Sequence, residues 1–326
     1  MVNNANCIIH AYEFDGKGGG IKLADDEAAA SAKSEKLAWV HLDATHPDTR
    51  AWLKDNVSYL DTIILDALLA EETRPRSIQH EDGLLAIMRG VNLNEGMEPE
   101  DMVSVRLWVD KSRIITMRRR PLMAIQDIAG YLEKGKGPKN AGDFMVKLTT
   151  RLFQRIEPII SELDDRTDVI EEVILDNPDV SLRHEIVDIR KMAIMMRRYL
   201  APQKDAISNI RSSDVSWIDV NQGRRLQENQ DRMTRYVEDL DAIRERAQIV
   251  KDELANILAD RMNKNMYVLS VVAAIFLPLG FLTGLLGINV GGMPGAEYDL
   301  AFWIVCLICV GFGAGLMALF RFMKWL

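Results

Sequence analysis

The hydrophobic pattern is clearest near the C-terminus, where no charged residue lies between Lys264 and Glu297. The segment from Met266 to Ile288 is almost wholly apolar, and at about 1.5 Å per residue it forms roughly 34 Å of helix, enough to cross a bilayer. A second apolar run, from Leu300 to Phe320, gives roughly 31 Å by the same rise. Because only a short polar connector joins the two runs, they predict an antiparallel transmembrane hairpin rather than the core of a soluble protein.

A seven-residue repeat precedes the first of these spans. From Gln222 to Lys264 the chain has no Pro, and no Gly after Gly223. Apolar residues take the two core positions of each repeat: Leu226, Met233, Leu240, Ala247 and Leu254, followed by Tyr236, Ile243, Val250 and Ile257. No breaker separates the repeat from the span, so we expect one continuous helix of about 70 residues that ends at Asn289. A coiled-coil seam on such a helix predicts that helices from several copies of the chain bundle about a common axis.

Before residue 135 the pattern alternates between short β-branched runs and helical periods. The predicted strands are Cys7 to Phe14, Leu37 to Asp43, Gly83 to Leu93, Met102 to Asp110 and Arg113 to Met117. The predicted helices are His46 to Asn56, Asp61 to Ala70 and Pro121 to Glu133, followed by two long ones, Asp143 to Asp176 and Leu182 to Ile210. A sheet flanked by helices is the architecture that this alternation favours.

These elements predict an α+β membrane protein in three parts. They are a cytoplasmic α/β domain (1–140), a cytoplasmic helical and stalk region (141–265), and a two-helix transmembrane pore domain (266–326) with a short outer loop (289–299). Arg261 and Lys264 precede the first span and Arg321 and Lys324 follow the second, whereas the loop has no Lys or Arg. The positive-inside rule therefore places both termini in the cytoplasm. The N-terminal residues lack a basic region followed by an apolar one, so we expect the first span itself to direct insertion.

Composition narrows the class of function. A net charge of −8 disfavours nucleic acid as a partner and is compatible with a surface that attracts divalent cations. Cys7, Cys306 and Cys309 give no disulfide framework, as in a reducing compartment. The α/β part has no phosphate-binding loop or nucleophile elbow, so we expect no enzyme. A membrane-anchored cytoplasmic sensor, with the hairpin only as its anchor, is the competing class.

One face of the first span is made of small and uncharged residues. Its positions are Asn263, Met266, Ser270, Ala273, Leu277, Gly280 and Gly284. Such a face either packs closely against another helix or, around a symmetry axis, lines a narrow apolar tube that gates by dewetting.

The outer end of this face carries the candidate pore mouth. A ring of Asn289 side chains, after Gly287 and Ile288, would offer neutral carbonyl oxygens to a hydrated cation. In the loop, Glu297 and Asp299 form either an acidic ring that concentrates cations or a merely solvated segment.

The layout resembles the CorA-type, two-span Gly-x-Asn superfamily of divalent metal ion transporters. The matching residues are Phe276-Leu-Pro-Leu279, Thr283-Gly284, Gly287-Ile288-Asn289 and Lys324-Trp325-Leu326. The resemblance covers the whole chain. It implies a funnel-shaped homopentamer in the bacterial inner membrane, surrounded by lipid, whose pore is lined by the first transmembrane helix.

Three further stretches look closer to the ZntB zinc-transporter branch: Trp39-Val-His-Leu-Asp43, Glu72-Thr-Arg-Pro-Arg76 and Met196-Arg-Arg-Tyr-Leu-Ala-Pro-Gln203. The magnesium branch typically has Gly-Met-Asn, whereas the middle residue here is Ile288. The resemblance therefore implies Zn2+ as the transported ion, moved inward with possible proton coupling, and no cofactor. The alternative within the superfamily is a Mg2+, Co2+ or Ni2+ channel.

The candidate pore face has no His, Asp or Glu, so zinc would pass it largely hydrated and without protein ligands. Neither span has an acid or histidine that could relay a proton. Elsewhere, the sequence suggests a cytoplasmic metal site made of His41, Asp43 and His46. The alternative is that each of these residues has a separate structural role. Cys306 and Cys309 have the spacing of metal ligands, but we expect ordinary apolar packing on a second span that faces lipid or the outer wall of the bundle.

Overall fold

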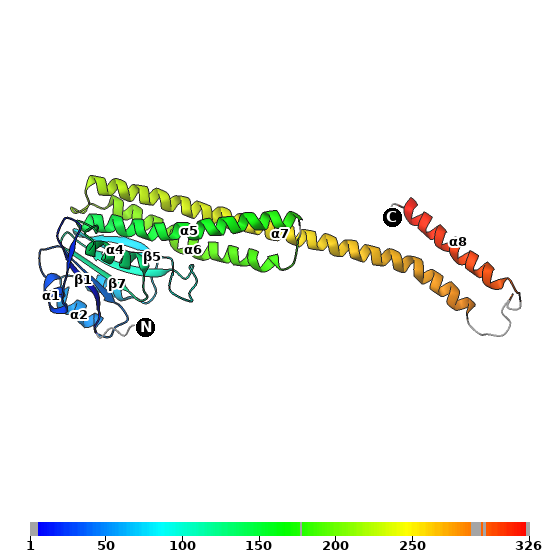
Figure 1. The fold of residues 1–326 in the computed structure, drawn as a ribbon, viewed down its shortest axis with the longest axis horizontal. Helices are drawn as coiled ribbons and strands as arrows, with labels where there is room; N and C mark the ends of the chain where they lie inside the picture. The colour runs from blue at the N-terminus through cyan, green and yellow to red at the C-terminus, as the bar shows by residue number, and fades with distance from the viewer. Residues whose placement is uncertain (1–5, 177, 288–294, 296–297, 324–326) are drawn as a thin grey trace. The chain divides into compact units, whose positions relative to one another are not determined.

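The structure is a computed structural model that describes residues 6–176, 178–287, 295 and 298–323 (Figure 1). Its internal contacts divide the chain into two units, Met1–Lys251 (unit 1) and Asp252–Leu326 (unit 2). The three-part division expected from the sequence stays a prediction.

Unit 1 contains a seven-stranded sheet of order β2-β1-β3-β7-β6-β5-β4. The strands are β1 (Ile8–Phe14), β2 (Gly20–Lys22), β3 (Ala38–Asp43), β4 (Arg76–His80), β5 (Gly83–Gly90), β6 (Val103–Val109) and β7 (Arg113–Arg118). Only β3 and β7 pair in parallel, and every other neighbouring pair is antiparallel. Every residue of β6 is buried, as expected for a central strand that is covered on both faces.

Helices cover both faces of this sheet (Figure 1). On one side, α1 (Asp25–Ser31), α2 (Thr49–Asn56) and α3 (Thr62–Leu69) form a core with Val40 and Leu42 of β3. On the other side, Trp39 of β3 lies with its ring centroid 5.3 Å from that of Phe144 of α5 (Ala141–Asp176). Successive residues of a strand point to opposite faces, so the alternation in β3 sends neighbouring side chains into two different cores. The helix α4 (Met123–Glu133) packs on α5.

The predicted strands and helices of unit 1 are confirmed to within a few residues at their ends, but three elements were missed. Both β2 and β4 are short edge strands, and β4 is almost wholly exposed, so neither has an alternating apolar pattern. The short α1 is rich in Ala rather than in larger apolar residues. Its one sequence signal is Glu27, whose carboxylate accepts a hydrogen bond from the Ala24 N–H at 2.8 Å. The helix expected to begin at His46 begins instead at Thr49, after Pro47.

Three long helices complete unit 1: α5, α6 (Leu182–Ser212) and the first part of α7 (Val220–Leu286). The seven-residue seam on α7 is buried here inside a single chain. Its most enclosed members, each at most 2% exposed, are Leu226, Met233, Leu240, Ile243 and Ala247.

Polar pairs hold this face of α7 against the other two helices. Arg246 forms ion pairs with Asp164 and Glu171 of α5, at 2.8 and 2.7 Å. Arg197 of α6 pairs with Asp241 at 2.6 Å. The expectation that the seam joins separate copies of the chain is therefore wrong for the repeats within unit 1, because α5 and α6 already occupy it.

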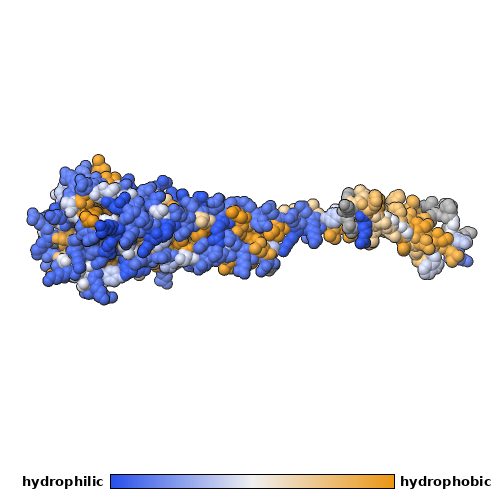
Figure 2. Space-filling model, turned by 90° about the horizontal axis from the view of Figure 1, so that it is seen from above, coloured by the Kyte–Doolittle hydropathy of each residue, from blue (hydrophilic) through white to orange (hydrophobic). Residues whose placement is uncertain are grey.

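The predicted continuity of stalk and span is confirmed, since α7 is one helix of 67 residues that runs through Pro278. Its last described helical residue is Leu286, and the predicted end at Asn289 lies outside the described residues. The second span is α8 (Ala301–Phe322). By length and composition, α7 and α8 are both able to cross a membrane. Figure 2 shows hydrophobic surface gathered on unit 2, whereas the surface of unit 1 is mostly hydrophilic.

Truncating the buried seam tests its role within the chain. We expect Leu240→Ala to lower the free energy of unfolding by about 2–5 kcal/mol, because it leaves a cavity between three helices. The matched control is Ile249→Ala on the same helix, where the side chain is 64% exposed; we expect a change within about 0.5 kcal/mol. Urea unfolding of the full chain in detergent, followed by circular dichroism, measures both. Equal losses in the two variants would contradict the intrachain assignment of the seam.

Candidate functional site

The face of α7 that the sequence singled out lies free of the rest of unit 2. All seven positions are exposed in the single chain: Asn263, Met266, Ser270, Ala273, Leu277, Gly280 and Gly284. Leu277, for example, is 75% exposed. A Cβ built on Gly280 or Gly284 would meet nothing within 4 Å. The single chain therefore leaves this narrow, small-residue face available to another molecule.

The helix α8 packs on the opposite side of α7. The Leu279 Cδ1 atom lies 3.7 Å from where a Cβ on Gly313 of α8 would be. The half-buried positions of α7 repeat at helical spacing: Val271, Ala274, Ile275, Pro278, Leu279 and Leu282. Residues two apart on a helix differ by about 200° in direction, so Leu279 and Leu277 point to nearly opposite sides. The contact with α8 thus leaves the candidate pore face open.

The polar side chains of this part of α7 are turned toward their own helix. Ser270 Oγ donates a hydrogen bond to the Met266 carbonyl oxygen at 2.8 Å, and Thr283 Oγ1 donates to that of Leu279 at 3.0 Å. A hydroxyl that donates to its own helix in this way keeps its oxygen lone pairs and is a neutral group without a charge to attract a cation. Chemically, the described face is a neutral and mostly apolar surface.

The candidate mouth lies mostly outside the described residues. Gly287 directly follows the end of α7, and its N–H donates to the Gly284 carbonyl oxygen at 3.2 Å. Ile288, Asn289 and Glu297 are not described, so their predicted roles stay predictions. Asp299 is exposed and lies just before α8.

The predicted cytoplasmic metal site does not form in the structure. His41 is fully buried in the sheet, whereas the Asp43 carboxylate accepts hydrogen bonds from the backbone N–H and hydroxyl of Thr45, at 2.8 and 2.6 Å. His46 lies in the turn before α2, with its Nδ1 3.7 Å from Asp48. Across the described parts of the chain, no group of three or more His, Cys, Asp or Glu residues is placed to hold a metal ion.

His41 instead belongs to a buried hydrogen-bonded group. Trp39 Nε1 donates to Thr116 Oγ1 at 2.7 Å, and the same hydroxyl lies 2.7 Å from His41 Nδ1. That hydroxyl and His41 Nδ1 share a hydrogen bond whose donor depends on the imidazole tautomer, and full burial favours the neutral imidazole. Burial, with Arg118 and His10 nearby, holds the pKa of His41 well below its usual value. The pKa of His10, stacked 5.9 Å away, is also lowered, chiefly by burial.

Cys306 and Cys309 lie on the side of α8 that packs toward α7. Both are half-buried free thiols in a stripe with Val305, Gly313 and Phe320. Their half-buried positions agree with the ordinary apolar packing expected for them.

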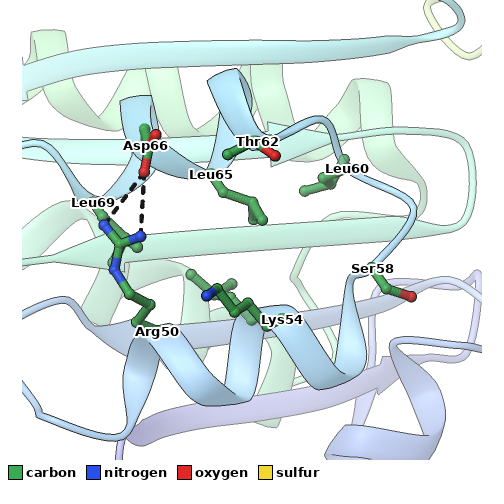
Figure 3. A pocket seen from close by; sticks show the side chains of 9 residues that line it. Arg50, Lys54, Ser58, Leu60, Thr62, Leu65, Asp66 and Leu69 are labelled. Carbon is green, nitrogen blue, oxygen red and sulfur yellow. Dashed lines mark hydrogen bonds and ion pairs between the residues drawn. The ribbon is translucent and has the colours of Figure 1, made fainter.

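A hollow of about 220 Å³ lies between α2 and α3 in unit 1. Figure 3 shows leucine side chains along it, with Arg50 and Asp66 joined at its rim at 3.3 Å. No nucleophile-and-base pair lines it. A second, more polar cavity contains Arg89, Arg119 and Arg120. Sequence reasoning missed these arginines because they come from segments far apart in the chain.

Comparison with known proteins adds the following. Residues 34–321 match the family model described as CorA-like Mg2+ transporter protein. The chain is 38% identical over 322 residues to the divalent cation transporter CmaX of Pseudomonas aeruginosa, with 98% of this chain and 97% of the relative covered. It is 35% identical over 318 residues to the zinc transport protein ZntB of Yersinia enterocolitica, with 98% and 96% covered.

Solved structures show the same likeness. The structure of the full-length CmaX protein matches with a TM-score of 0.85 and 37% identity over 100% of both chains. The CorA magnesium transporter from Methanocaldococcus jannaschii matches with a TM-score of 0.78 over 97% of this chain and 98% of that one; at 17% identity, this likeness shows the fold alone.

The buried imidazole predicts how stability depends on pH. Below about pH 6.5 the unfolded chain binds a proton at His41 that the folded chain does not, so stability falls on acidification by about 1.4 kcal/mol per pH unit for one such group. We expect His41→Asn, whose amide can keep the hydrogen bond to Thr116, to make this fall less steep. His184→Asn, at an exposed position, is the control. Unfolding free energies from pH 7.5 to 5.5 measure the slopes, and an unchanged slope in His41→Asn would contradict the assignment.

Proposed function

The chain belongs to the CorA-like Mg2+ transporter family, and on that premise we propose that it transports Zn2+ into the bacterial cytoplasm. The observation that carries the choice of ion is full-length similarity, at 35% and 36% identity, to proteins named zinc transport protein ZntB. Ile288, where the magnesium branch typically has Met, supports the same choice. The second candidate is a broader divalent-cation channel, which the similarity to the divalent cation transporter CmaX favours.

The proposed pathway is the exposed face of α7. In a homopentamer, five such faces around the axis form a narrow neutral tube, and α8 lies behind each of them. The N- and C-termini and unit 1 lie in the cytoplasm, as the Lys and Arg residues that flank the two spans indicate. Gly287, Ile288 and Asn289 form the outer mouth, where Glu297 and Asp299 raise the local concentration of cations.

The chemistry of the face sets the form in which the ion passes. None of the seven positions from Asn263 to Gly284 has a carboxylate, imidazole or thiol. Zn2+ prefers such nitrogen, sulfur and charged oxygen ligands, so the face does not strip its hydration shell and the ion passes hydrated. Selectivity then comes from the neutral ring of Asn289 and from the width of the tube.

The membrane potential is sufficient to drive import. A divalent ion that enters at −100 mV gains about 4.6 kcal/mol, at about 2.3 kcal/mol per charge. Proton coupling, which the ZntB branch implies, would need a titrating group along the path. In the described residues of the two spans, α7 from Met266 onward and α8, there is no Asp, Glu or His. We therefore propose that the membrane potential drives Zn2+ uptake. Whether protons move together with Zn2+ is a separate question for experiment.

Replacing Asn289, whose side-chain amides form the proposed ring, tests the outer pore mouth. The full chain in liposomes with an entrapped zinc indicator should take up Zn2+ under an inside-negative potential. We expect Asn289→Ala to lower the rate on the order of tenfold, because each subunit loses a side-chain carbonyl that can interact with the hydrated cation. Asn265→Ala removes the same amide from a position on α7 outside the candidate face and should transport normally. Normal flux through a correctly assembled Asn289→Ala variant would exclude Asn289 as the selectivity element.

Separating voltage from the pH gradient tests the driving force. We expect Zn2+ uptake to rise steeply as the inside becomes more negative, and to be unaffected by a pH gradient imposed at zero potential. Potassium with valinomycin sets the first variable, and internal and external buffers set the second. Uptake that follows the pH gradient at zero potential would establish proton coupling and contradict a purely voltage-driven mechanism.

A further inference from the structure

A cavity of about 330 Å³ in unit 1 gathers positive charge that the proposed transport does not use. Arg89 of β5 lines it, together with Arg119 and Arg120, which follow β7. Ser104 of β6 and Tyr199 of α6 complete its polar wall. Two acidic residues, Glu71 and Asp101, also reach the cavity.

Arg89 is held in place by neutral groups. Its Nη1 and Nη2 atoms donate hydrogen bonds to the carbonyl oxygens of Met102 and Thr73, at 2.5 and 2.8 Å. Its guanidinium carbon lies 4.1 Å from the centroid of the Tyr199 ring. Its Nε atom is buried and has no hydrogen-bond partner. The side chain is therefore fixed in position, and no ion pair with a carboxylate is formed by it among the described residues.

A second positively charged side chain, that of Arg106, lies buried near Arg89. Arg106 of β6 is 0% exposed and donates from Nη2 to the Ala70 carbonyl oxygen at 2.8 Å, whereas its Nε and Nη1 atoms have no partner. Burial, and then the nearby charges of Arg119 and Arg89, lower the pKa of Arg106 to about 10. Burying a guanidinium without a counter-charge is costly, and two neighbours of the same sign add to that cost.

The carboxylates around this cavity supply little of the missing charge. Within the described chain, Arg89, Arg106 and Arg120 have no carboxylate within 4.0 Å. Arg119 pairs only with Glu71, at 3.4 Å, and the Glu71 side chain is 85% exposed, so the pair is weak.

A second basic cavity in unit 1, lined by Tyr131, Lys147 and Arg225, gives a contrast. There, Lys147 and Arg225 both pair with the mostly buried Asp143, at 3.2 and 3.3 Å. Two cations of that cavity thus share a mostly buried carboxylate, whereas Arg89 and Arg120 have no carboxylate within 4.0 Å in the part of the chain that the structure describes.

We propose that the cavity of Arg89, Arg119 and Arg120 binds a phosphate group, either inorganic phosphate or the phosphate of a small organic molecule. Guanidinium groups donate two parallel hydrogen bonds to such an oxyanion. Phosphate carries nearly two negative charges at neutral pH, which matches several convergent cations better than a carboxylate with one charge does. The site is distinct from the ion pathway on α7, and its occupancy can be measured without any transport.

The test uses the full chain in detergent, in zinc-free buffer, with 31P line broadening as the readout. Inorganic phosphate and AMP are titrated separately, at constant ionic strength set by chloride. We expect one or both to bind the native chain. The double variant Arg119→Gln/Arg120→Gln should weaken binding on the order of tenfold or more, because it removes two charged donors. The matched control, Arg151→Gln/Arg225→Gln, loses the same charge from the other basic cavity and should bind as the native chain does.

The titrations distinguish an organic phosphate from free phosphate as the ligand. Tighter binding of AMP than of phosphate assigns the site to an organic phosphate, and the reverse assigns it to the free ion. Arg120→Gln alone, at an exposed position, should weaken binding in part and guards against misfolding of the double variant. The proposal is overturned if neither ligand binds, if both double variants lose binding equally, or if acetate displaces phosphate at equal concentration.

Discussion

The structure depends most on one constraint, the absence of charge along α7 from Asn265 onward and along all but the last turn of α8. A helix of this kind satisfies its own backbone hydrogen bonds but leaves apolar side chains that need cover. In the single chain, each of the two helices covers one stripe of the other, and most of the remaining surface is exposed. Lipid can cover the large apolar side chains, such as Phe276 and Phe281, which are 67% and 71% exposed. The small-residue face from Ser270 to Gly284 is better suited to approach another protein surface or to line a pathway.

The two halves of α7 satisfy their apolar faces in different ways. Up to Val250, its seam is closed by α5 and α6 within the chain, with Arg246 and Asn229 making polar links to α5. Beyond Met262 the side chains of the described residues that point away from α8 are exposed in the single chain. Association between copies, which the proposed pore requires, therefore depends on the membrane half of the helix and on surfaces of unit 1 other than the seam.

Sequence patterns predicted most elements because periodicity is a local property. Five of the seven strands of the sheet, and the unbroken α7, followed from the spacing of apolar residues. That spacing shows which side of a helix is buried but not which molecule covers it, so the seam was assigned to the wrong partners. The exposed edge strand β4 has almost no apolar signal to detect.

Sites were harder to predict than elements. The face on α7 could be found because all its members share one helix. His41 and Asp43 share one strand, but the metal site proposed for them fails because His41 is enclosed beside Thr116. Arg89 and Arg119 lie in different strands and loops, and only the folded sheet brings them to one cavity. In each case the sequence shows how residues are spaced along one element, but it does not show which elements come into contact.

The central claim, that the small-residue face of α7 lines the ion path, can be tested directly by thiol modification. In a background without the native cysteines, Ala273→Cys and Gly280→Cys lie on the face, and Ile275→Cys and Leu282→Cys lie on the side toward α8. We expect a small cationic methanethiosulfonate reagent to block Zn2+ uptake into liposomes through the first pair and to leave uptake through the second pair unchanged. Block through Ile275→Cys and Leu282→Cys, with unaffected uptake through Ala273→Cys and Gly280→Cys, would contradict the account.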